Sequence, residues 1–294
     1  MTQFVQAIIL GLLIGGVYAL LASGLTLIFG VMNVINVAHG AFLIVAAFLT
    51  YSIWNGTGLD PLLAIAITTP AMFAFGWLLY SGTIRRIREA PAAASVLLTF
   101  SLALVLEGVM GIAWGNTSHA IRPGYFNQSF TVGDLFFPKA QVYGCLVAIG
   151  VLVALYVFLT KTWTGRAIRA SAVNPQGARL VGVNVAAVAT MTFAIGVATT
   201  GAGGSIVGVL YPFLPGSHYL WISRLLGIIV LGGMGSLNGA IVGAILIGLG
   251  ESLTSTYISP QWTTAVPYVV IFLVLLGRPQ GLMGQRLRED VAAV

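Results

Sequence analysis

Three polar side chains interrupt a long apolar stretch near the N-terminus. The segment GVMNVINVAHG (30–40) carries Asn33, Asn36 and His39, followed by Gly40. The spacing of Asn33, Asn36 and Gly40 predicts one face of a helix, with His39 beside it. Amide and imidazole groups are costly in hydrocarbon, so we expect them to face a bundle interior or a water-filled path. They either line the route of a polar solute or form interhelical hydrogen bonds worth about 0.6 kcal/mol each.

Two carboxylates, Glu107 and Glu251, also lie well inside apolar segments. Acids in such segments are functional candidates because a charge buried in hydrocarbon is expensive. We place Glu107 with the residues of 30–40 as a candidate lining of the polar path. Arg224 could pair with either acid, so a proton relay and a structural ion pair both remain open.

No set of residues with catalytic spacing is present. The sequence contains no GxSxG and no HExxH motif, and His39, His119 and His218 are too far apart to form a ligand pattern. Neither lysine, Lys139 or Lys161, follows a glycine-rich phosphate-binding loop. The sequence therefore predicts no catalytic residue, no metal site, no cofactor and no ATP hydrolysis by that route, so we expect no enzyme activity.

The composition is that of a membrane protein. The 294 residues are 58% hydrophobic and only 7% charged, whereas soluble domains carry about 25% charged residues. The apolar runs are continuous rather than alternating, which favours an all-α, polytopic transmembrane bundle over a β-barrel. The net charge of +6 indicates topology signals and contact with anionic lipid headgroups, not nucleic acid.

The length of the apolar runs predicts eight to ten membrane spans. Basic residues follow the run that ends near Ile84 and fill Lys161–Asn184 and the tail 278–294, so the positive-inside rule puts these parts in the cytoplasm. Gly115–Ala140, with charges of both signs, suits the outer side. Ile222–Met234 must then cross the membrane, giving about nine crossings and an N-terminus outside.

A second interruption, GGMGSLNG (232–239), resembles the first in character. Paired interrupted helices mark sites near the membrane midplane in some transporters. Glycine-rich segments with an asparagine are also common turns between helices, and we favour a cytoplasmic turn here.

The segment Lys161–Asn184 is the largest polar break in the chain. It contains no acid, and its basic residues are Lys161, Arg166, Arg169 and Arg179. Such a segment cannot lie in hydrocarbon, so we expect it to contact something at the cytoplasmic surface.

Capping residues divide this segment into two short helices. Thr164 is placed to cap the first, Gly165–Ala172. Asn174 caps the second, with Pro175 at the first helical position and Gly182 just past the end.

Four pieces of the sequence carry a resemblance to a known family. In order and spacing they are similar to the membrane subunits of branched-chain amino acid ABC importers, the hydrophobic-amino-acid uptake type, over nearly the whole chain. One departure is Ala41, where relatives often have an acid, and it bears on substrate choice. The pieces are GVMNVINVAHGAF (30–42), TGRAIRASAVNPQGARLVGVNV (164–185), IVLGGMGSLNGAIVGAILIGLGES (229–252) and GRPQGLMG (277–284).

The resemblance implies one permease domain over residues 1–294 with a type II-like importer fold in the bacterial plasma (inner) membrane. The implied partners are ABC ATPase subunits, a second homologous permease in a heterodimer or homodimer, and a soluble substrate-binding protein. The implied substrates are branched-chain or related amino acids. Urea, short amides and aromatic or carboxylic acids are the alternatives.

The resemblance also implies a role for the polar break. In the family, the corresponding cytoplasmic loop is the coupling element that docks into a cleft of the ATPase, which makes Gly165–Ala172 and Pro175–Val181 the docking helices. The alternative is that its charges serve topology alone. The implied coupling residues are Gly165, Arg166, Arg169, Asn174, Pro175, Arg179 and Gly182.

Two other classes remain open from the residues alone. An ion-driven secondary transporter would use Glu107 and Glu251. A passive urea-type channel would need neither an ATPase nor the helix pair.

Overall fold

The computed structural model describes residues 2–87, 92–278 and 280–284. Residues 279 and 285–294 of the predicted tail lie outside this range. The α-helices of the described chain are α1 (Thr2–Met32), α2 (His39–Thr57), α3 (Ile65–Gly82), α4 (Ala92–Trp114), α5 (Lys139–Lys161), α6 (Trp163–Val173), α7 (Pro175–Leu180), α8 (Val185–Leu210), α9 (His218–Gly232), α10 (Leu237–Tyr257) and α11 (Val266–Gly277). Short 3₁₀ turns cover Ile84–Ile87, Pro215–Ser217 and Pro260–Ala265.

The prediction of a polytopic helical bundle is confirmed, with one small exception. Strands β1 (Ser129–Val132) and β2 (Leu135–Pro138) form an antiparallel hairpin in which Val132 pairs with Leu135. The two-residue loop is Gly133–Asp134, and Gly133 has φ of +60°. A Gly-Asp pair between two β-prone runs is a known hairpin signal that the sequence analysis overlooked.

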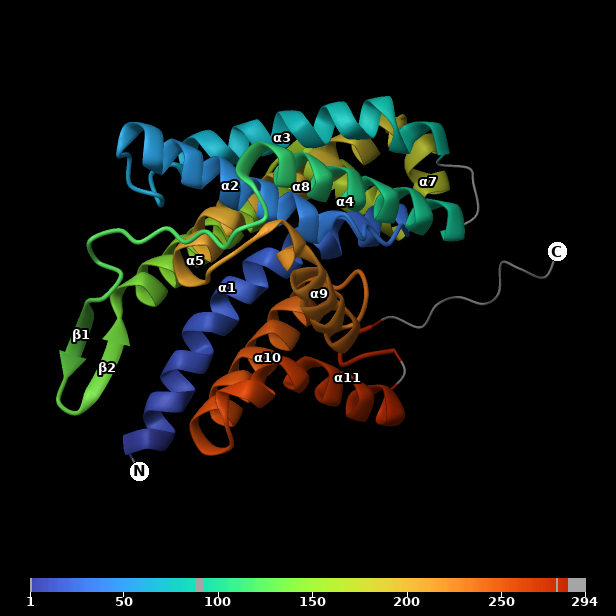
Figure 1. Ribbon diagram of the computed structural model, residues 1–294. Coiled ribbons are helices and arrows are strands. Elements are labelled where there is room, and N and C mark those ends of the chain that lie inside the picture. The colour runs from blue at the N-terminus through green and yellow to red at the C-terminus, as the bar shows by residue number, and fades with distance from the viewer. Residues whose placement is uncertain (1, 88–91, 279, 285–294) are drawn as a thin grey trace.

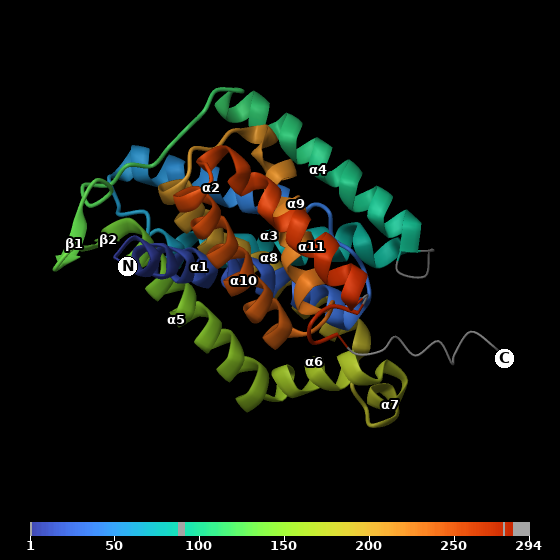
Figure 2. The same ribbon diagram turned by 90° about the horizontal axis from the view of Figure 1, so that it is seen from below.

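The helices run between two ends of an elongated bundle. In both views the hairpin and the N-terminus lie at one end and α7 lies at the other (Figures 1 and 2). In the described part of the chain, eight helices are long and apolar enough to span a membrane, within the predicted range of eight to ten.

Helix α9 is not among those eight because it has only 15 residues. Its two ends contact separate parts of the chain. Just before it, Phe213 pairs with His119 of the segment that leads to the hairpin. Just after it, Gly235 lies against Gly30 near the end of α1.

Helix α8 forms the centre of the bundle and packs against α1, α2, α3 and α5. Its glycines allow backbones to approach closely, as is typical of membrane helices. An added Cβ at Gly204 would lie 2.5 Å from the Leu43 carbonyl oxygen of α2, and one at Gly201 would lie 2.7 Å from Thr69 Cα of α3.

A buried hydroxyl network supplements this packing. Ser205 Oγ of α8 lies 2.7 Å from Thr50 Oγ1 of α2 and 3.2 Å from Thr68 Oγ1 of α3. Each hydroxyl also reaches a backbone carbonyl oxygen, of Ala46 for Thr50 and of Gly201 for Thr68 and Ser205. The contacts between hydroxyls therefore join the three helices without leaving a buried polar group unpaired.

Candidate functional site

The first polar interruption is a break between two helices, not a helical face. Helix α1 ends at Met32 and α2 begins at His39. Asn33 has φ of +52° and is exposed, while Asn36 is fully buried. The predicted common face of Asn33, Asn36 and Gly40 is therefore wrong. Asparagine tolerates the left-handed conformation, so Asn33 ends α1 and the later residues lose helical phase.

The broken segment is held by a hydroxyl from α4. Thr99 Oγ1 accepts a hydrogen bond from the Val37 N–H at 3.2 Å and lies 3.3 Å from the Ile35 carbonyl oxygen. Because Thr99 is itself buried, these contacts replace helical hydrogen bonds that the break has removed.

Asn36 and His39 are both 0% exposed. Neither the amide atoms of Asn36 nor the ring nitrogens of His39 have a hydrogen-bond partner of good geometry among the described residues, although the Leu21 backbone of α1 is near the His39 ring. Such groups cost about 1–3 kcal/mol each when left unsatisfied. The break therefore contains buried side-chain hydrogen-bonding groups that have no partner of good geometry among the described residues.

The start of α2 is in direct contact with the start of α9. A Cβ added at Gly40 would lie 2.5 Å from the His218 carbonyl oxygen and 3.0 Å from Ile222 Cβ. Only a glycine permits this approach.

The Glu107 side chain of α4 contacts the first two residues of α9, beside the contact between Gly40 and His218. Its Oε2 is 3.0 Å from His218 Nε2 and accepts a hydrogen bond from the Tyr219 hydroxyl at 2.9 Å. The Glu107 side chain is 30% exposed, so it is not sealed inside the bundle. The structure thus brings Glu107 close to Gly40 through His218.

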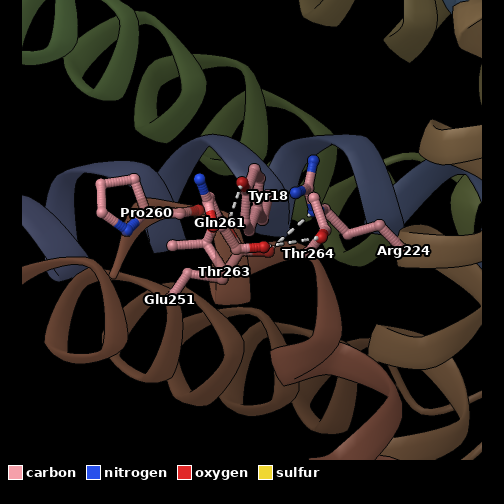
Figure 3. Close-up of polar contacts among 7 residues, drawn as sticks. All are labelled: Tyr18, Arg224, Glu251, Pro260, Gln261, Thr263 and Thr264. Atoms are coloured by element: carbon pink, nitrogen blue, oxygen red, sulfur yellow. Dashed lines mark hydrogen bonds and ion pairs between the residues drawn. The ribbon is translucent and has the colours of Figure 1, made fainter. Parts of the chain in front are cut away.

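Glu251 and Arg224 form a separate, buried ion pair. Arg224 Nε donates to Glu251 Oε1 at 2.8 Å, and the Tyr18 hydroxyl donates to Oε2 at 2.6 Å (Figure 3). The guanidinium also lies over the rings of Tyr18 and Trp221, at 5.2 and 5.1 Å from their centroids. Because every charge is partnered within the protein, this arrangement favours the structural ion pair over the proton relay.

The second interruption forms a tight turn between α9 and α10. Gly233 and Gly235 have φ of +100° and +84°. Ser236 Oγ caps α10 by accepting from the Gly239 N–H at 3.1 Å. The predicted turn is confirmed, and because Gly30 lies against Gly235, the two interrupted regions meet at one end of the bundle.

The polar segment 161–184 contains the two expected helices, and three of their four boundaries shift by one or two residues. Helix α6 begins at Trp163, and its cap is Thr162, whose Oγ1 accepts from the Gly165 N–H at 3.0 Å. The prediction that Thr164 caps a helix starting at Gly165 is wrong, because Thr162 is extended and Thr164 is already helical.

The second helix begins at the predicted residue and ends at Leu180, one residue before the predicted end at Val181. Asn174 Oδ1 accepts from the Gly177 N–H at 2.9 Å, and Pro175 is the first residue of α7. Gly182 has φ of +85° beyond the helix end. Asn184 also caps α8 through the Ala187 N–H at 3.0 Å, a signal in the sequence that we missed.

Helix α6 has one buried and one exposed side. Ala167 and Ile168 pack with residues of α1, α5 and α8. Gly165 sits so close to the Leu159 backbone of α5 that a Cβ would overlap it. Arg166 and Arg169 are exposed, as are the α7 residue Arg179 and the apolar residues Val173, Leu180 and Val181.

A cleft of about 250 Å³ lies beside α6. Its walls come from α1, α5, α6 and the start of α10, and include Leu27, Tyr156, Arg169 and Asn238. Arg169 therefore borders the cleft, whereas Arg166 is not part of its lining.

The opposite end of the bundle presents the hairpin. The Gln6 side chain of α1 holds it by donating to the Phe136 carbonyl oxygen at 2.6 Å and accepting from the Phe136 N–H at 2.8 Å. Nearby, the Tyr125 hydroxyl donates to Asp60 Oδ1 at 3.3 Å. Burial, and then the Asp60 carboxylate, raises the pKa of Tyr125, so the phenol remains a hydrogen-bond donor.

Comparison with known proteins identifies the family. The sequence model described as the permease component of a branched-chain amino acid transport system matches residues 7–275. The chain belongs to this family. The resemblance found in the sequence is thereby confirmed, and the chain is a transport permease component.

The relatives cover nearly the full length of this chain. It is 29% identical to the high-affinity branched-chain amino acid permease LivH of Escherichia coli K12 and 27% identical to BraD of Pseudomonas aeruginosa, with 98% of both chains aligned in each case. It is 24% identical to LivM of E. coli over 91% of this chain and 68% of that protein. No solved structure matches this chain.

Within the described residues, no three His, Cys, Asp or Glu side chains form a group that could hold a metal ion. The candidate functional features are therefore the helix break, the α6–α7 pair and the hairpin.

Proposed function

We propose that this chain imports branched-chain or related amino acids as the membrane subunit of an ATP-driven transporter. The observation that carries the coupling part of this proposal is the α6–α7 pair. It is a pair of capped, exposed and basic helices at the end of the bundle opposite the hairpin. Positive charge alone would satisfy topology without two capped helices, so we assign α6 and α7 to contact with a separate ATPase.

The charge pattern supports an acidic docking partner. Arg166, Arg169 and Arg179 are exposed, and no Asp or Glu occurs between Asp134 and Glu251. Exposed Val173 and Leu180 add apolar contact area beside the arginines, as is usual for a protein interface. Gly165, Asn174, Pro175 and Gly182 are positioning residues in this proposal because they set the backbone of the helix pair.

The hairpin end then faces the outer side, and α6–α7 and the tail face the cytoplasm. A soluble substrate-binding protein would deliver substrate near the hairpin, where Phe130, Val132 and Phe136 are exposed. Movement of α6 would pass to α5 and α8, against which it packs, and would alternate access around the helix break. Asn33, Asn36, His39, Gly40 and Glu107 are the proposed pathway residues.

A second permease subunit completes the proposed assembly. The chain aligns with both LivH and LivM of E. coli, so a paired core of two related permeases is compatible with its family. We propose such a dimer in the bacterial inner membrane.

The variant Arg166→Glu with Arg169→Glu tests the docking role. We expect it to insert into the membrane normally but to lose the ATPase subunit on co-purification, because like charges now face the acidic partner. Arg122→Glu, at an exposed arginine on the hairpin side, is the matched control and should retain the ATPase. Retained association and normal ATP-driven uptake in the double variant would refute the docking role.

An ion-coupled mechanism is the second candidate, because Glu107 is partly open and contacts a titratable histidine. We expect uptake by the Glu107→Gln variant in proteoliposomes to remain dependent on ATP. Glu107 is a cleaner test than Glu251, whose replacement would also strand Arg224. Uptake by the purified chain alone on an ion gradient, abolished by Glu107→Gln, would replace our proposal with the ion-coupled one.

A further inference from the structure

The start of α2 is an uncapped helix N-terminus inside the bundle. The N-cap is Ala38, which offers no side-chain acceptor. The His39 N–H reaches the Asn36 carbonyl oxygen at 3.2 Å. Because the first N–H groups of a helix lack intrahelical partners, those of Gly40 and Ala41 point out of the helix end. Both residues are buried, so bulk water does not compensate for them.

Independent side-chain evidence comes from the residues that flank this turn. Asn36 and His39 are fully buried, and their polar side-chain atoms lack partners of good geometry in the described chain. A fold rarely leaves this many buried polar groups unsatisfied without a ligand or ordered water. The unsatisfied groups and the uncapped helix end lie within six residues of one another in the sequence.

The ligand chemistry follows from the groups present. A helix N-terminus carries a partial positive charge and favours an anion. The Asn36 side-chain amide can add two N–H donors. The neutral His39 ring has a single N–H, which can be directed to the Leu21 backbone or to a ligand. Glu107, the acid on the neighbouring α4, is already engaged by His218 and Tyr219. A carboxylate has two oxygens that can accept several hydrogen bonds from such a donor set.

We propose that the first turn of α2, with Asn36 and His39, binds the carboxylate of the transported solute. This rests on the proposed transport function and narrows it. Amino acids and aromatic or other carboxylic acids carry the required group, whereas urea and short amides do not. Elements of α1, α4 and α9 meet this turn at Leu21, Thr99 and Ile222, so a bound carboxylate would contact several helices that must move during transport.

The test is equilibrium binding to the full chain with its partner subunits, purified in nanodiscs without the soluble binding protein. The labelled probes are L-leucine and benzoate, which carry a carboxylate, and urea, which does not. We expect at least one of the two carboxylates to bind and urea not to bind. Asn36→Leu should raise the Kd of that carboxylate at least tenfold while leaving the thermal unfolding midpoint equal or higher, because leucine removes an unsatisfied amide.

Asn36→Asp is the second variant, and it has nearly the shape of the parent side chain. Its carboxylate should weaken binding of the anionic probe more than Asn36→Leu does, through like-charge repulsion. Asn55→Asp is the matched control, since Asn55 is an exposed asparagine near the far end of the same helix, and it should bind as the parent does.

Three outcomes would overturn the site. These are binding of urea alone, no binding of either carboxylate, or an unchanged Kd in both Asn36 variants, which would mean that the amide holds water only. Uptake by the complete system is measured in parallel. If uptake depends on the ATPase but the Kd is unchanged in the Asn36 variants, only the proposal of the carboxylate site is refuted. If uptake does not depend on the ATPase, the proposed function itself is refuted.

Discussion

Replacing Arg224 with methionine should destabilise the chain by about 3–5 kcal/mol. The substitution leaves the Glu251 carboxylate buried with no cation beside it, since the two side chains are 9% and 8% exposed. It also removes the cation that lies over the rings of Tyr18 and Trp221. The measurement is the thermal unfolding midpoint in detergent, followed by size-exclusion chromatography of the fluorescently tagged chain.

The double variant Arg224→Met with Glu251→Gln is the control for this effect. Glutamine keeps an oxygen that can accept from the Tyr18 hydroxyl, and no uncompensated charge remains. We expect most of the lost stability to return, because removing both charges of a buried pair costs far less than removing one. If the double variant is as unstable as the single one, the pair is not coupled and its assignment as a structural ion pair fails.

The second large effect concerns the close contact of α1 and α10. A Cβ at Gly248 would lie 2.6 Å from the Gly11 carbonyl oxygen and 2.7 Å from Gly15 Cα. These are backbone atoms, so no side chain can rotate away and the two helices must separate. We expect Gly248→Ala to cost about 1–3 kcal/mol, read as a lower midpoint in the same thermal assay.

Gly108→Ala is its matched control. Gly108 also lies within a membrane helix, and an added Cβ there meets nothing within 4 Å. Alanine favours helix by about 1 kcal/mol over glycine, so this variant should be as stable as the parent or more so. A Gly248→Ala midpoint at or above that of Gly108→Ala would show that the close approach of α1 and α10 is not rigid.

Local signals in the sequence were sufficient for much of this fold. Long apolar runs predicted the spans because each helix satisfies its own backbone in hydrocarbon. Asn174, Pro175 and Gly182 predicted α7 because caps act over three or four residues. The wrong choice of Thr164 as the cap of α6 also has a local cause. Thr162 and Thr164 are both suitable N-cap residues, and only the extended backbone conformation of Thr162 shows that it is the cap.

Other features depended on contacts between distant residues. From the sequence, Arg224 could pair with either Glu107 or Glu251. In the fold it pairs with Glu251, which also accepts a hydrogen bond from Tyr18, 233 residues away along the chain. Glu107 of α4 instead contacts His218, the first residue of α9 and 111 residues away along the chain. The spacing of residues along the sequence cannot decide which of two distant acids pairs with a given arginine or histidine.

At the helix break, some properties follow from the sequence alone and others follow only from the tertiary structure. The sequence by itself determined which polar residues interrupt the apolar run and that lipid would not tolerate them, because that cost belongs to each group separately. Only the tertiary structure decided that Asn33 turns outward while Asn36 and His39 are enclosed beside an uncapped helix end. Enclosure depends on α4 and α9 closing over the break, and these helices lie far away along the chain.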